Sequence, residues 1–479
     1  MLVPAAPLML VPGTRIPLPY RQEATFFYLT GVYDQGCHEA VCALELNATG
    51  EKLTYRLFVN EDDEERVRWE GPRLGVRDAK DLQCDVMETL PNLPRYLHQV
   101  KSQNRPLVID GKMWKGHAYA KHVYQNTPGK GDGALLPVYT SFGSTGRGGG
   151  IAPGSGTPLG TSVIYDTLEQ TVHALRWKKT EHELDMMRCS AQITTRAFQT
   201  CMRNSHPSMN EREISSLFEF LCKSEGAQRM PYPQVVAGGN SACTIHYSNN
   251  DRKVFDGEMV LMDAGCDFHG YVSDVTRTWP IGGKFTEPQR EVYGEVLEAH
   301  RECLAQCVEG ATLRDIHRTS VHLLSRSLSR LGIVQKTTQE VLLQGLYKPY
   351  YPHSIGHWLG MDTHDVHTVS ATKPFEVGTV LTIEPGLYLP RNCHEIPAQY
   401  RGIGIRLEDD VVVQEGAPEV LSGGVPITPE DVEETVGNFM EYEGQTLGKL
   451  SVVYNSSHNQ MLSFWKNQIE MILKENKEV

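Results

Sequence analysis

The sequence predicts an α+β protein with two folded domains, at residues 1–160 and 161–435, and a C-terminal extension at 436–479. Three observations support this division. Residues 20–140 alternate strand-like apolar runs with polar helical stretches, as in an α/β domain. Residues 143–160 are rich in Gly, Ser, Pro and Thr, a composition typical of a loop or linker. From residue 162, amphipathic helices alternate with strands, without glycine-rich turns between them.

Elements of the first domain follow from short hydrophobic runs bounded by turn residues. We expect strands at 40–46, 53–59 and 105–110, and an acidic helix at 61–69. The glycine-rich segment that follows does not fit a phosphate-binding loop, because its glycine spacing is wrong, it contains a proline and no strand precedes it.

The second domain is predicted to open with a helix at 178–198, where Leu184, Met187 and Ala191 recur at helical spacing. Further helices are expected at 211–224, 287–309 and 312–331, and strands at 257–263, 271–279, 378–384 and 403–413. In the extension, residues 461–474 carry an apolar stripe. We interpret this segment as a helix that docks on the folded part, and a membrane-surface helix is the less favoured alternative.

Charge and composition exclude several classes of function. The chain has 479 residues, with 46 Lys+Arg against 59 Asp+Glu and a formal net charge of −13. A surface with this balance does not attract nucleic acid or anionic lipid, so neither is an expected partner. No apolar run reaches the 18 residues that a transmembrane helix needs.

Cysteine usage bears on the compartment. The eleven cysteines show no Cys-x-x-Cys spacing, which argues against a zinc ribbon or a redox motif and favours free thiols in a reducing compartment. The N-terminal 19 residues contain five prolines and one charged residue, unlike a secretory signal or a transit peptide. We therefore expect a cytoplasmic protein, with the mitochondrial matrix as the alternative.

A pair of aspartates provides the first chemical signal. Two strand-like runs in residues 258–279 flank a turn containing Gly270. A hairpin centred between Phe268 and His269 would pair Asp263 with Asp274 and place both carboxylates on one face. Two such charges repel unless a cation lies between them, which suggests a divalent metal. Alone the signal is weak, because Asp is also common at strand ends as a turn former.

Other segments add potential metal ligands. Residues 352–365 contain His353, His357 and His364 among glycines, and the strand at 379–384 ends in Glu384 before a Pro-Gly pair. Glu408 follows in a Glu-Asp-Asp run. Four carboxylates and one imidazole are too acidic for a structural zinc site and suit two divalent ions, with manganese, cobalt or zinc as candidates.

These residues carry a resemblance to the pita-bread metallopeptidases, which include methionine aminopeptidase, prolidase and aminopeptidase P. The family's ligand order of Asp, Asp, His, Glu, Glu falls on Asp263, Asp274, His357, Glu384 and Glu408, and the likeness spans residues 178–432. Residues 21–31, RQEATFFYLTG, resemble the motif that opens the N-terminal domain of aminopeptidase P, a domain that methionine aminopeptidase lacks. The chain is most similar to the bacterial and mitochondrial-type intracellular forms of aminopeptidase P.

The resemblance implies a fold and a site. It implies a creatinase/ribonuclease H-like N-terminal domain and a catalytic domain with a curved, mostly antiparallel sheet. The five ligands would hold two divalent ions, most readily manganese, around a bridging hydroxide. Further roles are implied for residues around the metals. His246 and His364 would stabilise the oxyanion and grip the peptide, and His353 would line the proline pocket. Glu384 would act as proton shuttle, and Arg406 would join a relay with Tyr388 or neutralise nearby carboxylates.

The expected activity is hydrolysis of the Xaa-Pro bond at the N-terminus of peptides with proline in second position, by a homodimer. An Xaa-Pro dipeptidase (prolidase) is the alternative within the same chemistry. A non-catalytic binding protein on the same fold is a third hypothesis, which the complete ligand set disfavours.

Overall fold

A computed structural model describes residues 1–14, 16–33, 37–47, 53–60, 64–71, 82–103, 105, 107–110, 112–125, 163–165 and 167–438. These residues form two compact units, one up to Thr171 and one from Val172 onward, each described here by itself. The division falls within helix α5 (Thr167–Arg176). The domain limits at 160 and 435 stay a prediction, and the glycine-rich segment and the 461–474 helix lie outside the described residues.

The first unit is built on a six-stranded mixed sheet with the order β4-β3-β2-β1-β5-β6. Its strands are β1 (Leu2–Pro4), β2 (Val41–Leu46), β3 (Leu53–Val59), β4 (Val86–Thr89), β5 (Leu107–Ile109) and β6 (Val163–Tyr165). β1, β2 and β3 are antiparallel neighbours, whereas β4, β5 and β6 each join by a parallel pairing. Its helices are α1 (Ala24–Thr30), α2 (Glu64–Glu70), α3 (Leu93–Ser102) and α4 (Ala120–Gln125). All four elements predicted in this region are confirmed.

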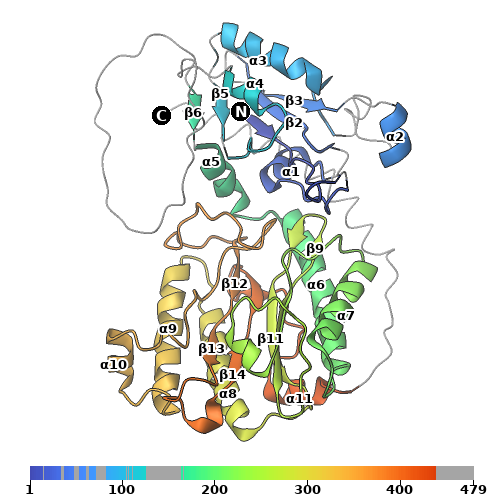
Figure 1. Ribbon diagram of the computed structural model, residues 1–479. Helices are drawn as coiled ribbons and strands as arrows, with labels where there is room; N and C mark the ends of the chain where they lie inside the picture. The colour runs from blue at the N-terminus through green and yellow to red at the C-terminus, as the bar shows by residue number, and fades with distance from the viewer. Residues whose placement is uncertain are drawn as a thin grey trace. The chain divides into compact units, whose positions relative to one another are not determined.

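The second unit combines long helices with short antiparallel strands (Figure 1). The helices are α6 (Glu181–Arg203), α7 (Glu211–Ser224), α8 (Glu287–Leu304), α9 (Leu313–Arg330), α10 (Thr338–Leu343) and α11 (Pro429–Thr435). The strands are β7 (Val235–Gly238), β8 (Met259–Ala264), β9 (Asp267–Phe268), β10 (Tyr271–Val272), β11 (Val275–Pro280), β12 (Val380–Ile383), β13 (Gly386–Leu389), β14 (Ile403–Arg406), β15 (Asp409–Val412) and β16 (Glu419–Val420). The predicted α+β class is correct, and the four predicted helices are present with ends shifted by a few residues.

The register of the aspartate hairpin differs from the prediction. Asp263 pairs with Thr276 rather than with Asp274, because the two-residue turn is His269–Gly270, and both of these residues have positive φ angles, of 50° and 83°. A two-residue turn of this kind matches the twist of an antiparallel pair. The shift is two residues, so Asp263 and Asp274 still share one face, now as diagonal neighbours.

The strand predicted at 403–413 is two strands. β14 pairs with β13, and β15 pairs with β12, so the chain passes from one sheet to another between them. At the crossing, the Leu407 amide donates to the Pro385 carbonyl and the Glu408 amide to that of Thr276. The crossing places Glu408 beside β11.

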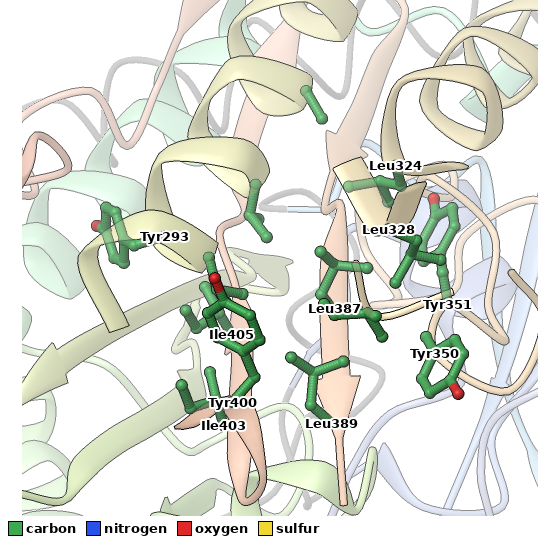
Figure 2. Packing of buried hydrophobic residues seen from close by; sticks show 14 of the residues in the cluster. Tyr293, Leu324, Leu328, Tyr350, Tyr351, Leu387, Leu389, Tyr400, Ile403 and Ile405 are labelled. Carbon is green, nitrogen blue, oxygen red and sulfur yellow. The ribbon is translucent and has the colours of Figure 1, made fainter. Parts of the chain in front are cut away.

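A hydrophobic core packs β13 and β14 against α9. Leu387 of β13 and Ile405 of β14 are fully buried against Leu324 and Leu328 of α9 (Figure 2). Burying a side chain of this size contributes about 1.5–3 kcal/mol, so this packing stabilises the position of β13 and β14 against α9. Among the described residues, no helix is long and apolar enough to cross a membrane.

Candidate metal centre

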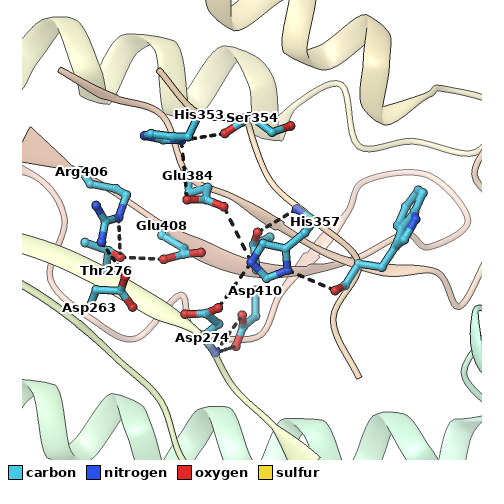
Figure 3. A network of polar contacts seen from close by, with 12 residues as sticks. Asp263, Asp274, Thr276, His353, Ser354, His357, Glu384, Arg406, Glu408 and Asp410 are labelled. Carbon is cyan, nitrogen blue, oxygen red and sulfur yellow. Dashed lines mark hydrogen bonds and ion pairs between the residues drawn. The ribbon is translucent and has the colours of Figure 1, made fainter. Parts of the chain in front are cut away.

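The five predicted ligands lie on separate elements that converge in the second unit (Figure 3). Asp263 lies on β8, and Asp274 directly precedes β11. His357 lies in a long loop before β12, Glu384 directly follows β12, and Glu408 occupies the crossing between β14 and β15. Ligand atoms of Asp274, His357 and Glu408 all lie within 4.8 Å of one another.

The remaining ligands are linked to this trio by short contacts. His357 Nε2 lies 3.4 Å from Asp274 Oδ2 and 3.7 Å from Glu384 Oε1. The Tyr232 hydroxyl lies 2.8 Å from Asp263 Oδ1 and 2.5 Å from Asp274 Oδ1. Four carboxylates and an imidazole therefore surround one small volume.

The orientation of His357 is fixed by its surroundings. Its Nδ1 lies 3.1 Å from the Trp358 carbonyl, and its backbone amide donates to Thr382 Oγ1 at 3.2 Å. A hydrogen bond from Nδ1 to a carbonyl leaves the lone pair on Nε2, the nitrogen that faces the carboxylates. This arrangement is the usual support of a metal-binding histidine.

Burial and mutual repulsion shift the pKa values of the carboxylates, as expected where a cation binds. Burial, together with the charges of Asp274 and Asp263, raises the pKa of Glu384 to about 7, against the lowering effect of His357 and Arg406. Burial and the charges of Asp274 and Glu384 also raise the pKa of Glu408 well above its usual value. Burial alone would lower the pKa of His357, but its hydrogen bond to Asp274 and the charge of Glu384 raise it to about 9. The donor set fits divalent cations, which would remove this repulsion.

Neighbouring groups contact Glu408 and Asp274. The Thr276 hydroxyl donates to Glu408 Oε2 at 2.6 Å. Asp410 accepts the backbone amide of Asp274 on both oxygens, at 3.2 and 3.1 Å. Thr276 therefore supports one of the proposed ligands from behind. Asp410 was missed, although it belongs to the same acidic run as Glu408.

Tyr232 was also missed. It lies between two prolines in a segment without periodicity, and nothing in the sequence places it near Asp263, 31 residues away. Only the fold brings its hydroxyl to the two aspartates.

The other predicted site residues lie around the carboxylates. Arg406 donates from Nη1 to the Tyr388 hydroxyl at 2.9 Å and from Nη2 to Asp263 Oδ2 at 2.5 Å. The Tyr388 hydroxyl also lies 2.8 Å from His353 Nε2. The His364 ring packs edge-on against His357, with centroids 4.5 Å apart.

His246 is exposed on the loop after β7. Its charge acts on His353 and His364, lowering the pKa of each as a minor effect beside burial. All the predicted site residues thus lie in one region of the second unit.

Two family models match the chain. The model for metallopeptidase family M24 matches residues 185–415, which include all five predicted ligands. The model for the aminopeptidase P N-terminal domain matches residues 1–109.

Individual proteins match over most of the chain. Human Xaa-Pro aminopeptidase 3 is 34% identical over 423 residues, 88% of this chain and 77% of that protein. The mitochondrial intermediate cleaving peptidase 55 of Arabidopsis thaliana is 34% identical over 438 residues, 91% of this chain and 79% of that protein. The solved structure of Escherichia coli aminopeptidase P with the inhibitor Pro-Leu superposes with a TM-score of 0.77 at 30% identity, covering 91% of this chain and 93% of that one.

The match to these structures confirms the N-terminal domain and the pita-bread domain expected from the sequence. The family also implies divalent metal ions, which the acidic donor set fits. The chain therefore belongs to metallopeptidase family M24, and it is a metallo-exopeptidase of the Xaa-Pro aminopeptidase group.

Proposed function

We propose that this protein is a dinuclear-metal aminopeptidase that hydrolyses the Xaa-Pro bond at the N-terminus of peptides. The observation that carries the proposal is the convergence of Asp263, Asp274, His357, Glu384 and Glu408 around one small volume. We assign Asp263 to one metal, His357 and Glu384 to the other, and Asp274 and Glu408 to both.

Two bound divalent ions would lower the pKa of a shared water towards 7, supplying a hydroxide nucleophile at neutral pH, and would polarise the scissile carbonyl. We favour manganese, with cobalt and zinc as alternatives, because an oxygen-rich donor set with a single imidazole suits manganese best.

Glu384 is the proposed proton carrier. With metal bound its carboxylate would be deprotonated, so it could accept a proton from the attacking water. It would pass this proton to the imino nitrogen of the leaving proline. His364 and His246 would stabilise the oxygen of the attacked carbonyl and hold the peptide.

His353 is assigned to the proline side of the site. Burial and the charge of Arg406 lower its pKa to about 3, so the ring is neutral at pH 7. A neutral ring, held by Tyr388 and Ser354, would form an uncharged side of the proline pocket. The amide before proline has no N–H, so a pocket that fits the ring gains selectivity over sites that require that proton. Inhibition of the Escherichia coli enzyme by Pro-Leu is consistent with such a pocket.

Hydrolysis of Arg-Pro-Pro and Gly-Pro by manganese-reconstituted protein, with EDTA as control, tests the function. Cleavage of the tripeptide at its first bond, abolished by EDTA, supports the proposal. Cleavage of the dipeptide alone would replace it with prolidase activity. Inertness towards both peptides with metal bound would favour a binding protein.

We also propose a homodimer in the cytoplasm, with the mitochondrial matrix as the alternative. All eleven cysteines are free thiols, in keeping with a reducing compartment, and both locations provide one. The mitochondrial relative in Arabidopsis keeps the alternative open. Sedimentation of the protein and imaging of a tagged full-length chain would test these two proposals.

A further inference from the structure

His364 differs from the other histidines of the site in how its ring is held. Within the described part of the chain, its imidazole makes no hydrogen bond, and its ring contact is with His357. By contrast, His353 and His357 are each fixed by contacts of their ring nitrogens. The exposed His364 ring is therefore placed by its backbone and by its packing against His357.

The next residue, Asp365, is a buried anchor. Its side chain is 1% exposed and accepts from Arg176 on Oδ1 and from Lys179 Nζ on Oδ2 at 3.1 Å. Both cations are themselves buried, with side chains 2% exposed. Two buried cations that converge on one carboxylate leave it no freedom to move.

The backbone of Asp365 connects this anchor to the metal centre. Its amide donates to the Trp358 carbonyl at 3.0 Å. That same carbonyl lies 3.1 Å from His357 Nδ1. The anchor therefore fixes the spacing between the two histidines.

The chain is strained directly after the anchor. Val366 is buried and has a φ angle of 35°, a region that β-branched residues avoid. On its far side, Thr368 Oγ1 lies 2.8 Å from His173 Nδ1. Such strain persists only where contacts on both sides impose it.

There is also no room for the anchor to shift. A Cβ atom at Gly360 would lie 2.4 Å from Asp365 Oδ2 and 2.9 Å from Lys179 Cε. The loop backbone thus passes directly over the ion pair, and glycine permits this close approach.

We propose that Asp365, anchored by Arg176 and Lys179, is a positioning residue that holds His364 over His357 for catalysis. The inference rests on the proposed function, in which His364 acts on the substrate carbonyl. A purely structural ion pair would stabilise the loop without affecting catalysis through His364 in particular.

A double-mutant cycle separates the two roles. With Arg-Pro-Pro as substrate and metal content measured for each protein, Asp365→Asn is expected to lower kcat about 10- to 100-fold with little change in KM, because small displacements of a catalytic group cost this much. In a His364→Ala background the same change should cost less than about threefold. Equal losses in both backgrounds would overturn the proposal.

The matched control is Glu225→Gln. Glu225 is also buried and is ion-paired to Arg196 on α6, outside the site residues described above. We expect this variant to keep its kcat, so a loss of kcat equal to that of Asp365→Asn would overturn the proposal.

A second variant covers the case in which Asp365→Asn does not fold. Val366→Gly keeps the ion pairs and relieves the strained backbone, but it deletes a buried side chain and so costs stability. Its kcat is therefore measured well below its melting temperature, and it should fall about tenfold as His364 gains freedom. Unchanged kcat would contradict the proposal.

One readout does not depend on turnover, so it separates failure of the positioning role from failure of the proposed function. In histidine-labelled protein, the imidazole NMR signals of His364 and His357 should shift in Val366→Gly and stay in place in Glu225→Gln. Unshifted signals in Val366→Gly would overturn the positioning role even if the wild-type protein were inert on Arg-Pro-Pro.

Discussion

Arg406 Nη2 contacts Asp263 Oδ2 at 2.5 Å, and this contact joins the guanidinium to the metal centre (Figure 3). The same side chain donates from Nε to Thr276 Oγ1 at 3.1 Å, and Thr276 in turn donates to Glu408. With its contact to Tyr388, the planar fork of Arg406 thus serves three groups at once.

Arg406→Lys should therefore behave as a severe change. A lysine ammonium is a single point donor and cannot reach Asp263, Tyr388 and Thr276 together. We expect kcat/KM on Arg-Pro-Pro to fall about 100-fold and metal affinity to fall 10- to 100-fold, as for loss of a group that supports ligands. Steady-state kinetics measures kcat/KM, and metal titration measures the affinity. Wild-type values for both quantities would show that the contacts of Arg406 are not needed for metal binding or catalysis.

Removal of Glu408 tests the ligand set directly. Glu408→Ala deletes a carboxylate assigned to both metals and should abolish activity, with loss of at least one bound ion. Elemental analysis alongside kinetics provides the measurement. Glu419→Ala, which removes a carboxylate paired with Arg188 away from the proposed ligands, is the control and should keep both properties. Full turnover by Glu408→Ala would refute the site assignment.

Metal binding and stability should depend on pH in a defined direction. Glu384 and His357 have pKa values raised to about 7 and about 9 in the metal-free fold, so the folded chain holds protons that the unfolded chain has released. The metal-free protein should then lose stability as pH rises from about 4.5 through 7 for Glu384 and from about 6.5 through 9 for His357.

Bound metal requires both groups to be deprotonated, so its affinity should increase over the same range. Melting temperatures between pH 5 and 9, with and without manganese, are expected to diverge by several degrees towards high pH. A constant difference across the range would contradict this linkage. Glu408→Ala, which binds less metal, should show a smaller divergence.

The sequence predicted this site well where local pattern and geometry coincide. Asp263 and Asp274 were expected on one face, and they lie on one face although the predicted register was wrong by two residues. Side chains alternate along a strand, so an even error preserves the face whereas an odd error would have reversed it. The turn at His269–Gly270, with its positive φ angles, decided the register.

Groups that support the ligands could not be predicted in the same way. Lys179 and Asp365 are 186 residues apart, and Tyr232 and Asp274 are 42 apart. No periodicity connects such pairs, because only the packing of distant elements brings them together. The crossing at Glu408 was missed for a related reason, since residues 403–413 are continuously strand-like and change partners without a turn signal.

Glu211, at the start of α7, gives a prediction for the loop that carries His246. The side chain is fully buried, and it accepts from the Gly238 amide at 2.8 Å, from the Tyr247 hydroxyl at 2.9 Å and from the Arg252 amide at 3.0 Å. These donors lie at the beginning, middle and end of the loop. One carboxylate therefore fixes the whole segment around His246.

Glu211→Gln replaces one acceptor oxygen with a donor that faces a buried N–H or hydroxyl. We expect about 1–3 kcal/mol of destabilisation, together with a several-fold rise in KM for Arg-Pro-Pro, because His246 is proposed to grip the peptide. Urea unfolding and steady-state kinetics measure the two effects. Tyr247→Phe removes a single contact and should show a smaller change in both. If Glu211→Gln lowered stability but left KM at the wild-type value, the loop would be held for folding alone and His246 would not bind the substrate.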